Sequence, residues 1–177
     1  MEYLDIILSI DYDGFPYGNK DLNWLKNRLI KLIENSKAPI VILACNTLSS
    51  LVFYYDLKFE KTIVDVITPT IYFLRKKKYE NIAILSTKNT KEMGVYSKLL
   101  HINIEYIDVD ELITEIQGGI VKDDTISLVI NKISKKNDAI VLGCTHLIKI
   151  KDKIREKTKI DVLSQDEIFV EFLNENI

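Results

Sequence analysis

Several features that mark whole classes of protein are absent from this sequence. No apolar run reaches the roughly 18 residues that a membrane-spanning helix needs. The first residues, MEYLDIILSIDYDG, carry acids and no basic segment, so they do not resemble a signal peptide. The net charge of −2 offers no basic surface for nucleic acid. These absences predict a cytoplasmic protein whose partners include neither a membrane nor a nucleic acid.

Cysteine and histidine are also scarce, with two of each among 177 residues. In a cytoplasmic protein two cysteines are expected to be free thiols rather than a disulfide. The spacing of these cysteines and histidines does not match the ligand patterns of a zinc site. We therefore expect two free thiols and no bound metal.

The residues that are present predict an ordered α/β fold. Hydrophobic residues make up 47% of the chain and charged residues 28%, which is enough apolar material to form a core. The expected strands are residues 5–10, 39–45, 62–67, 81–87, 103–109, 138–144 and 159–164. The expected helices are residues 21–35, 47–58, 69–75, 91–100, 110–117, 123–136, a helix that ends near residue 157, and a short C-terminal helix. This alternation predicts mostly parallel sheets that are flanked by helices.

The two cysteines occupy matching places, in ACNT at residues 44–47 and in LGCTH at residues 142–146. Each follows a buried strand, and ligands of open α/β sheets bind beyond the carboxyl ends of strands. The helix N-terminus that follows is expected to lower the pKa of a thiol. One such cysteine is usually a small buried apolar side chain, but two in matching turns favour function. Two thiols on opposite sides of a carbon could racemise or epimerise it by proton transfer.

Both motifs resemble the paired cysteine motifs of the aspartate/glutamate racemase superfamily. FPYGNK at residues 15–20 narrows the resemblance to the glutamate racemase family, and LSTKNT at residues 85–90 is similar to the threonine-containing substrate loop of that family. The order and approximate spacing of the four motifs match, from about residue 5 to the C-terminus. The resemblance implies an enzyme that interconverts L- and D-glutamate without a cofactor and supplies D-glutamate for peptidoglycan.

The resemblance also implies a role for each matching residue. Cys45 would take the Cα proton from D-glutamate, Cys144 would take it from L-glutamate, and His146 would assist Cys144. Amide and hydroxyl groups would stabilise the substrate carboxylate as it gains enediolate character, without a metal or pyridoxal phosphate. The substrate-binding residues implied by the family pattern are Pro16, Tyr17, Gly18, Asn46, Thr47, Thr87, Thr90 and Thr145.

The family has two similar α/β lobes with the active site in the cleft between them. By this pattern residues 1–67 and 159–177 form the first lobe, and residues 68–158 form the second. The first lobe is expected to be truncated, because the usual N-terminal strand and Asp-Ser-Gly turn have no counterpart here. LSQDE at residues 163–167 also departs from the family pattern. Apolar surface left by a missing strand would favour a homo-oligomer.

Three interpretations remain open at this point. The chain is a shortened but active racemase, in which Asp11 or a partner chain completes the site. Alternatively, it is a degenerate relative that binds an amino acid or a protein partner without turnover, or it is a fragment of a longer enzyme. Aspartate racemase is a related alternative, but the FPYG motif argues against it. The enzyme interpretation requires Cys45 and Cys144 to lie on opposite faces of one cleft.

Overall fold

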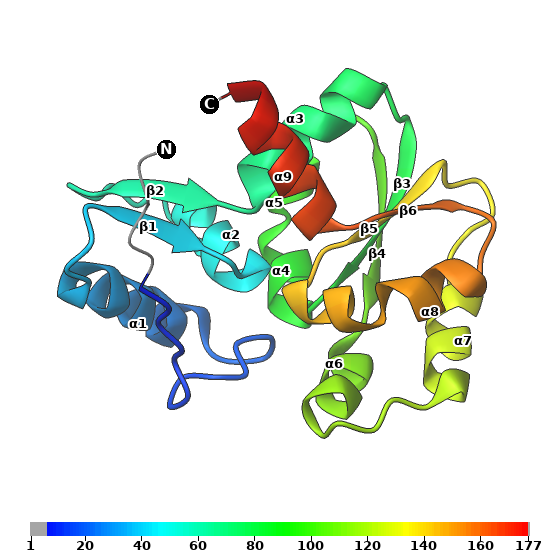
Figure 1. Ribbon diagram of the computed structural model, residues 1–177, viewed down its shortest axis with the longest axis horizontal. Helices are drawn as coiled ribbons and strands as arrows, with labels where there is room; N and C mark the ends of the chain where they lie inside the picture. The colour runs from blue at the N-terminus through cyan, green and yellow to red at the C-terminus, as the bar shows by residue number, and fades with distance from the viewer. Residues whose placement is uncertain (1–6, 177) are drawn as a thin grey trace.

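A computed structural model describes residues 7–176 and has the α/β architecture that the sequence predicts. Two separate sheets, both entirely parallel, are flanked by helices (Figure 1). Parallel strands need crossover connections, which the intervening helices provide. Within the described range, no helix is both long enough and apolar enough to cross a membrane.

The smaller sheet pairs two strands from the N-terminal half of the chain. This half contains α1 (Leu22–Asn35), β1 (Ile40–Leu43), α2 (Asn46–Tyr54), β2 (Thr62–Asp65) and α3 (Ile67–Lys77). Asp21 caps α1, because its carboxylate accepts a hydrogen bond from the backbone N–H of Trp24. Leu25 and Leu29 of α1 are fully buried, as their helical spacing predicts.

The larger sheet has the strand order β4-β3-β5-β6. Its strands are β3 (Asn81–Ser86), β4 (Asn103–Asp108), β5 (Ala139–Leu142) and β6 (Asp161–Leu163). The helices around it are α4 (Lys88–Met93), α5 (Val95–Leu99), α6 (Asp110–Gln117), α7 (Asp123–Asn131), the 3₁₀ helix η1 (Thr145–Ile150), α8 (Lys151–Glu156) and α9 (Gln165–Asn176). The two central strands, β3 and β5, are almost entirely buried, as apolar strands covered on both faces should be.

The alternation of side chains along β3 divides the core into two clusters. Ile82 and Ile84 face one cluster, whereas Ala83 and Leu85 face the other. The first cluster also contains Leu25 of α1, so it joins the smaller sheet to the larger one. The carboxyl ends of β1 and β5, where the two cysteines lie, are therefore held by one continuous apolar core.

The N-terminal strand predicted at residues 5–10 is wrong over the part that is described. Residues 7–10 form no strand, and residues 5 and 6 lie outside the described residues. An isolated extended segment leaves its backbone hydrogen bonds unmade, and within residues 7–176 no strand pairs with this one. Ile7 and Leu8 are consequently exposed, as are Ile40 and Ile42 on β1.

The predicted place of the C-terminal segment in the first lobe is corrected by the pairing of its strand. β6 pairs with β5, with Ala139 opposite Asp161, so it belongs to the larger sheet. The physical reason is the short crossover through η1 and α8, which returns the chain directly to the edge of β5. α9 then packs against α3 and is a full 12-residue helix rather than a short one.

Local backbone chemistry divides the helix predicted at residues 91–100. Thr87 caps α4, because its hydroxyl accepts a hydrogen bond from the backbone N–H of Thr90, so the helix begins at Lys88. Gly94 adopts a left-handed conformation with φ of 59°, which ends α4 and separates it from α5. The start of α4 thereby lies beside the end of β3, close to the cysteines.

Candidate active site

The two cysteines stand in equivalent backbone positions. Cys45 precedes α2 with φ of −147° and ψ of 122°, and Cys144 precedes η1 with φ of −144° and ψ of 125°. Both are free thiols, Cys45 half-buried and Cys144 buried. Both line one pocket, which opens to solvent and has a cavity volume of about 70 Å³. The structure therefore brings the two predicted thiols together in a single cleft.

Most of the predicted site residues line the same pocket. The exception is Thr90, which is buried and lies behind Thr87. The lining residues that the motifs did not predict are Phe15, Asn19, Asp110, Ile113, Thr114, Gln117 and Gly143. In the part of the chain that the structure describes, no group of three histidine, cysteine or acidic residues could hold a metal ion.

The expectation that a helix N-terminus lowers the thiol pKa is wrong for Cys144. Burial is the main reason why its pKa rises to about 12, and negative charge at Cys45 and Asp110 contributes to the same rise. A hydrogen bond from the backbone N–H of His146 opposes this rise but does not overcome it. Cys144 is therefore a neutral thiol at pH 7.

Cys45 follows the same balance, because burial raises its pKa as well. The opposing contributions come from the backbone N–H groups of Leu48 and Thr47 and from the hydroxyl of Thr47. These donors at the start of α2 are arranged to stabilise a thiolate once one forms. The site thus contains two protonated thiols, each with donors for its charged form.

His146 lies directly beside Cys144. Its Nδ1 atom is 3.7 Å from the Cys144 Sγ atom, and its ring stacks on Phe15 with the centroids 5.1 Å apart. Burial, followed by the charge of Lys149, lowers the pKa of His146, so the ring is neutral at pH 7. A neutral imidazole at this distance can exchange a proton with the thiol, which suits the predicted assisting role.

The loop at residues 15–20 is fastened to the larger sheet by Asn89, a residue that the motifs did not assign. Asn89 donates three hydrogen bonds of 2.8 Å, from its backbone N–H to the Gly18 carbonyl and from Nδ2 to the carbonyls of Tyr17 and Lys20. A Cβ atom on Gly18 would lie 2.8 Å from Asp110 Oδ1, so glycine permits the close approach. The loop is therefore held across the mouth of the pocket.

Replacement of Asn89 with alanine is expected to free this loop. The carbonyls of Tyr17 and Lys20 would lose their buried hydrogen-bond donor. Because a buried polar group without a partner is costly, the free energy of unfolding should fall by about 1–3 kcal/mol. KM for the substrate should rise about tenfold, with a smaller change in kcat, because the loop lines the binding pocket. Steady-state kinetics and urea unfolding measure the two effects.

The matched control for this prediction is Asn103→Ala. It removes an exposed amide that bonds only to the side chain of Asn81, away from the pocket. Both kinetic constants of the control should stay within twofold of those of the original chain. Equal KM values for the Asn89→Ala and Asn103→Ala variants would show that the loop needs no fastening.

Asp11, which the sequence suggests as a group that could complete the site, binds to its own loop and to α1 instead. Its carboxylate accepts hydrogen bonds from Arg28 Nε at 3.0 Å, from the Tyr17 hydroxyl at 2.7 Å and from the Gly14 N–H at 3.1 Å. The bond from Arg28 is the largest cause that lowers the Asp11 pKa to about 2. Asp11 is not among the pocket-lining residues, and it instead shapes the loop that carries Tyr17.

Three threonine hydroxyls meet where the two halves of the chain join. The Oγ1 atoms of Thr47 and Thr87 are 3.0 Å apart, and Thr90 Oγ1 lies 3.0 Å from Thr87 and 3.3 Å from Thr47. Thr145 adds a further link, because its hydroxyl donates to the Ala44 carbonyl at 3.1 Å. The predicted threonines therefore connect the two cysteine turns, and all of them except Thr90 also line the pocket.

The side chain of Asn46 is committed to a buried polar network. Its Nδ2 donates to Gln165 Oε1 at 2.5 Å, and its Oδ1 accepts from the Tyr96 hydroxyl at 2.7 Å and from Gln165 Nε2 at 3.1 Å. Gln165 Nε2 also lies 3.0 Å from the Thr70 hydroxyl. The side chain of Asn46 is therefore already engaged, and the part of Asn46 that is available to a ligand is its backbone at the start of α2.

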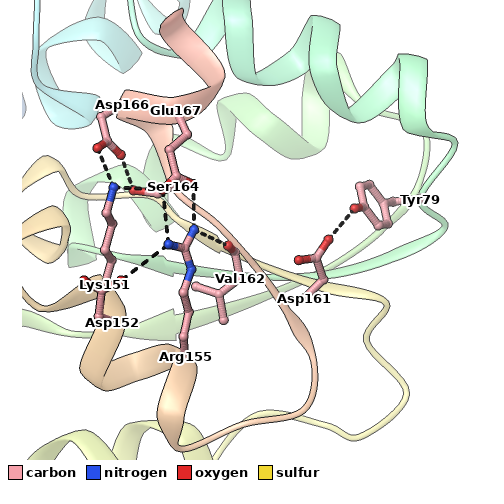
Figure 2. A network of polar contacts seen from close by, with 9 residues as sticks. All are labelled: Tyr79, Lys151, Asp152, Arg155, Asp161, Val162, Ser164, Asp166 and Glu167. Atoms are coloured by element: carbon pink, nitrogen blue, oxygen red, sulfur yellow. Dashed lines mark hydrogen bonds and ion pairs between the residues drawn. The ribbon is translucent and has the colours of Figure 1, made fainter. Parts of the chain in front are cut away.

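Ion pairs hold the start of α9 against α8 (Figure 2). Lys151 Nζ lies 2.8 Å from both Asp166 and Glu167, and Arg155 reaches Glu167 at 2.6 Å. The segment LSQDE, which departs from the family pattern, thus has a defined place in this fold. It supports the turn that carries Cys45 through the bond from Gln165 to Asn46.

The known proteins that resemble this sequence include several glutamate racemases. The chain is 33% identical over 174 residues to a glutamate racemase from Fusobacterium nucleatum, covering 90% of this chain and 66% of that protein. It is 32% identical over 171 residues to a glutamate racemase from Buchnera aphidicola, covering 87% and 67%. The chain thus spans about two thirds of the length of these relatives.

The fold comparison agrees with the sequence comparison. A crystal structure of a glutamate racemase isoform from Bacillus anthracis superimposes with a TM-score of 0.77 at 17% identity, covering 94% of this chain and 71% of that one. No protein-family model matches the sequence. The pocket described above therefore occurs on the fold shared by these enzymes.

Proposed function

Because this chain belongs to the glutamate racemase family, we propose that it interconverts L-glutamate and D-glutamate through Cys45 and Cys144, without a cofactor. The observation that carries this proposal is the pair of thiols at equivalent strand ends in one pocket. The alternative of binding without turnover would not require two such thiols. It has no comparable support in the geometry.

The proposed reaction is a proton transfer through the substrate Cα atom. With L-glutamate, the Cys144 thiolate accepts the Cα proton, and the electron pair of the C–H bond enters the carboxylate as an enediolate. The Cys45 thiol then donates its proton to the opposite face, which gives D-glutamate and a Cys45 thiolate. The reverse direction exchanges these roles, and solvent restores the protonation of both groups. His146 assists Cys144 in that last step.

Stabilisation of the enediolate falls to neutral donors. The backbone N–H groups at the starts of α2 and η1 and the hydroxyls of Thr47 and Thr145 are the candidates. Pro16, Tyr17 and Gly18 would bind the distal end of the substrate, within the loop that Asn89 fastens. The hydroxyl of Tyr17 is committed to Asp11, so Tyr17 would contribute its ring and backbone.

The wider assignments follow from this activity. D-glutamate made in the cytoplasm would enter peptidoglycan synthesis and so contribute to cell shape. The first lobe would comprise residues 1–67 and the second residues 68–158, with β6 added to the second sheet. Self-association stays a prediction, supported by the exposed Ile40 and Ile42 side chains on β1.

The direct test is the optical activity of the substrate. In the presence of the purified chain, the circular dichroism of L-glutamate should decay to zero, and that of D-glutamate should decay to zero from the opposite sign. L-aspartate, which is one methylene shorter than L-glutamate, serves as the comparison substrate. A pocket discriminates between substrates that differ by one methylene by about 1–3 kcal/mol. A folded chain that leaves both glutamate signals unchanged would refute the proposed activity.

A further inference from the structure

One carboxylate stands alone among the residues that line the pocket. Asp110 is the only lining residue, among those the structure describes, that carries a full charge at pH 7, because His146 is neutral and no lysine or arginine lines the pocket. Asp110 is the first residue of α6, directly beyond the carboxyl end of β4. It therefore belongs to the same edge of the sheet as Cys144, where ligands of parallel sheets bind.

The surroundings of Asp110 provide, among the described residues, no salt bridge for its charge. Within residues 7–176 it forms no salt bridge, and its Oδ2 atom accepts a long hydrogen bond of 3.4 Å from the backbone N–H of Lys88. The Lys88 ammonium group pairs instead with Glu92, at 3.7 Å. Burial, and then the charge of Asp108, raises the pKa of Asp110, against smaller opposing contributions from the backbone N–H and the charge of Lys88.

A bound cation would relieve this unfavourable electrostatic situation. Glutamate at pH 7 carries one cationic group, its α-ammonium, and two carboxylates that an ionised Asp110 would repel. We propose that Asp110 binds the α-ammonium group of the substrate and so fixes which way round the amino acid lies between the two thiols. This inference rests on the proposed racemase function and names the residue that orients its substrate.

The position of Asp110 also links substrate orientation to the loop at residues 15–20. Asp110 Oδ1 lies so close to Gly18 that a Cβ atom there would be 2.8 Å away. Negative charge at Asp110 also raises the pKa of Cys144, so an ammonium group that neutralised it would make the Cys144 thiolate easier to form. Binding of the correct substrate would thereby favour the base that acts on it.

The test compares two ligands that differ only in the amino group. L-glutamate and glutarate are titrated calorimetrically into the Cys144→Ser chain, where turnover does not interfere, with and without the additional change Asp110→Asn. The Kd for L-glutamate should rise about tenfold or more in the Asp110→Asn chain, as expected for loss of a charged partner. The Kd for glutarate, which has no ammonium group, should stay the same or fall.

Asp124→Asn is the matched control, because it removes the same charge from an exposed acid of α7 that does not line the pocket. It should leave both Kd values within twofold. Equal changes for the two ligands, or tighter binding of both, would overturn the proposal, because Asp110 would then face a carboxylate or no ligand group. If L-glutamate binds normally but the chain without these substitutions leaves its optical activity unchanged, the racemase function fails separately. Absence of any glutamate binding overturns both.

Discussion

Replacing either Cys45 or Cys144 with serine is expected to lower kcat/KM for glutamate racemisation by about 10²- to 10⁴-fold, the range that a positioned acid/base group contributes. Serine keeps nearly the same shape, but its hydroxyl is a far weaker acid than a thiol. Because both thiols line the pocket, the loss should be similar in the two variants and in both reaction directions. Circular dichroism of L- and of D-glutamate measures each direction.

The control for the serine variants is their thermal unfolding, which should match that of the original chain because volume and burial hardly change. Each variant should also retain proton removal on one face of the substrate. Cys45→Ser keeps Cys144, so it should exchange the Cα proton of L-glutamate without inverting it. A serine variant that racemises within tenfold of the original rate would show that the missing thiol is not an acid/base group.

The second large effect concerns pH. Burial raises the pKa of both thiols, that of Cys144 to about 12, so only a small fraction of either is thiolate near neutrality. The base must be a thiolate. While the pH is below the pKa of the thiol, the thiolate fraction increases tenfold for each unit by which the pH rises. We expect kcat/KM, which reports the free enzyme, to rise about tenfold per unit between pH 6 and 8.

A parallel measurement excludes instability as the cause of this pH dependence. The two thiols should contribute little to any change of the unfolding midpoint from pH 6 to 8, because both remain protonated throughout that range. The lowered pKa of His146 should make the midpoint rise slightly with pH, because the unfolded chain binds more protons near pH 6 than the folded chain does. kcat/KM that is flat or that falls from pH 6 to 8 would contradict the raised thiol pKa values. It would indicate that the helix N-termini outweigh burial in solution.

Local patterns were sufficient for most of the fold. The apolar run at residues 138–144 predicted β5, and the helical spacing of Leu25 and Leu29 predicted α1. The pairing of strands was harder to predict from the sequence, because it depends on segments that lie far apart along the chain. The sheet that β6 joins is decided by its contact with β5, and residues 7–10 lack a strand to pair with in the described part of the chain.

The candidate site likewise contains residues that local motifs predicted and residues whose roles depend on contacts across the fold. The cysteines, His146 and the threonines belong to short motifs, and all of them except Thr90 line one pocket. Asn89 and Gln165 were missed because their roles come from contacts across the fold, such as the bond between Gln165 and Asn46. Asp110 had a usable signal, since it follows directly on the carboxyl end of β4.

The thiol pKa values show why a local pattern can give the wrong direction. A strand end followed by a helix N-terminus predicts a lowered pKa for Cys144. Burial and the charge of Asp110, supplied by a segment more than thirty positions away in the printed sequence, raise it instead. Electrostatics in the site is therefore a property of the packed pocket and not of the cysteine turn alone.

The central claim, that two different thiols serve opposite faces of one carbon, is tested most directly by isotope incorporation. The chain is incubated with L-glutamate in D₂O, and both enantiomers are recovered early in the reaction and analysed by NMR. With two bases, D-glutamate should carry deuterium at Cα from the first turnover, while the remaining L-glutamate keeps its proton. Deuterium that enters recovered L-glutamate as fast as D-glutamate forms would mean that one base serves both faces, and would contradict the account.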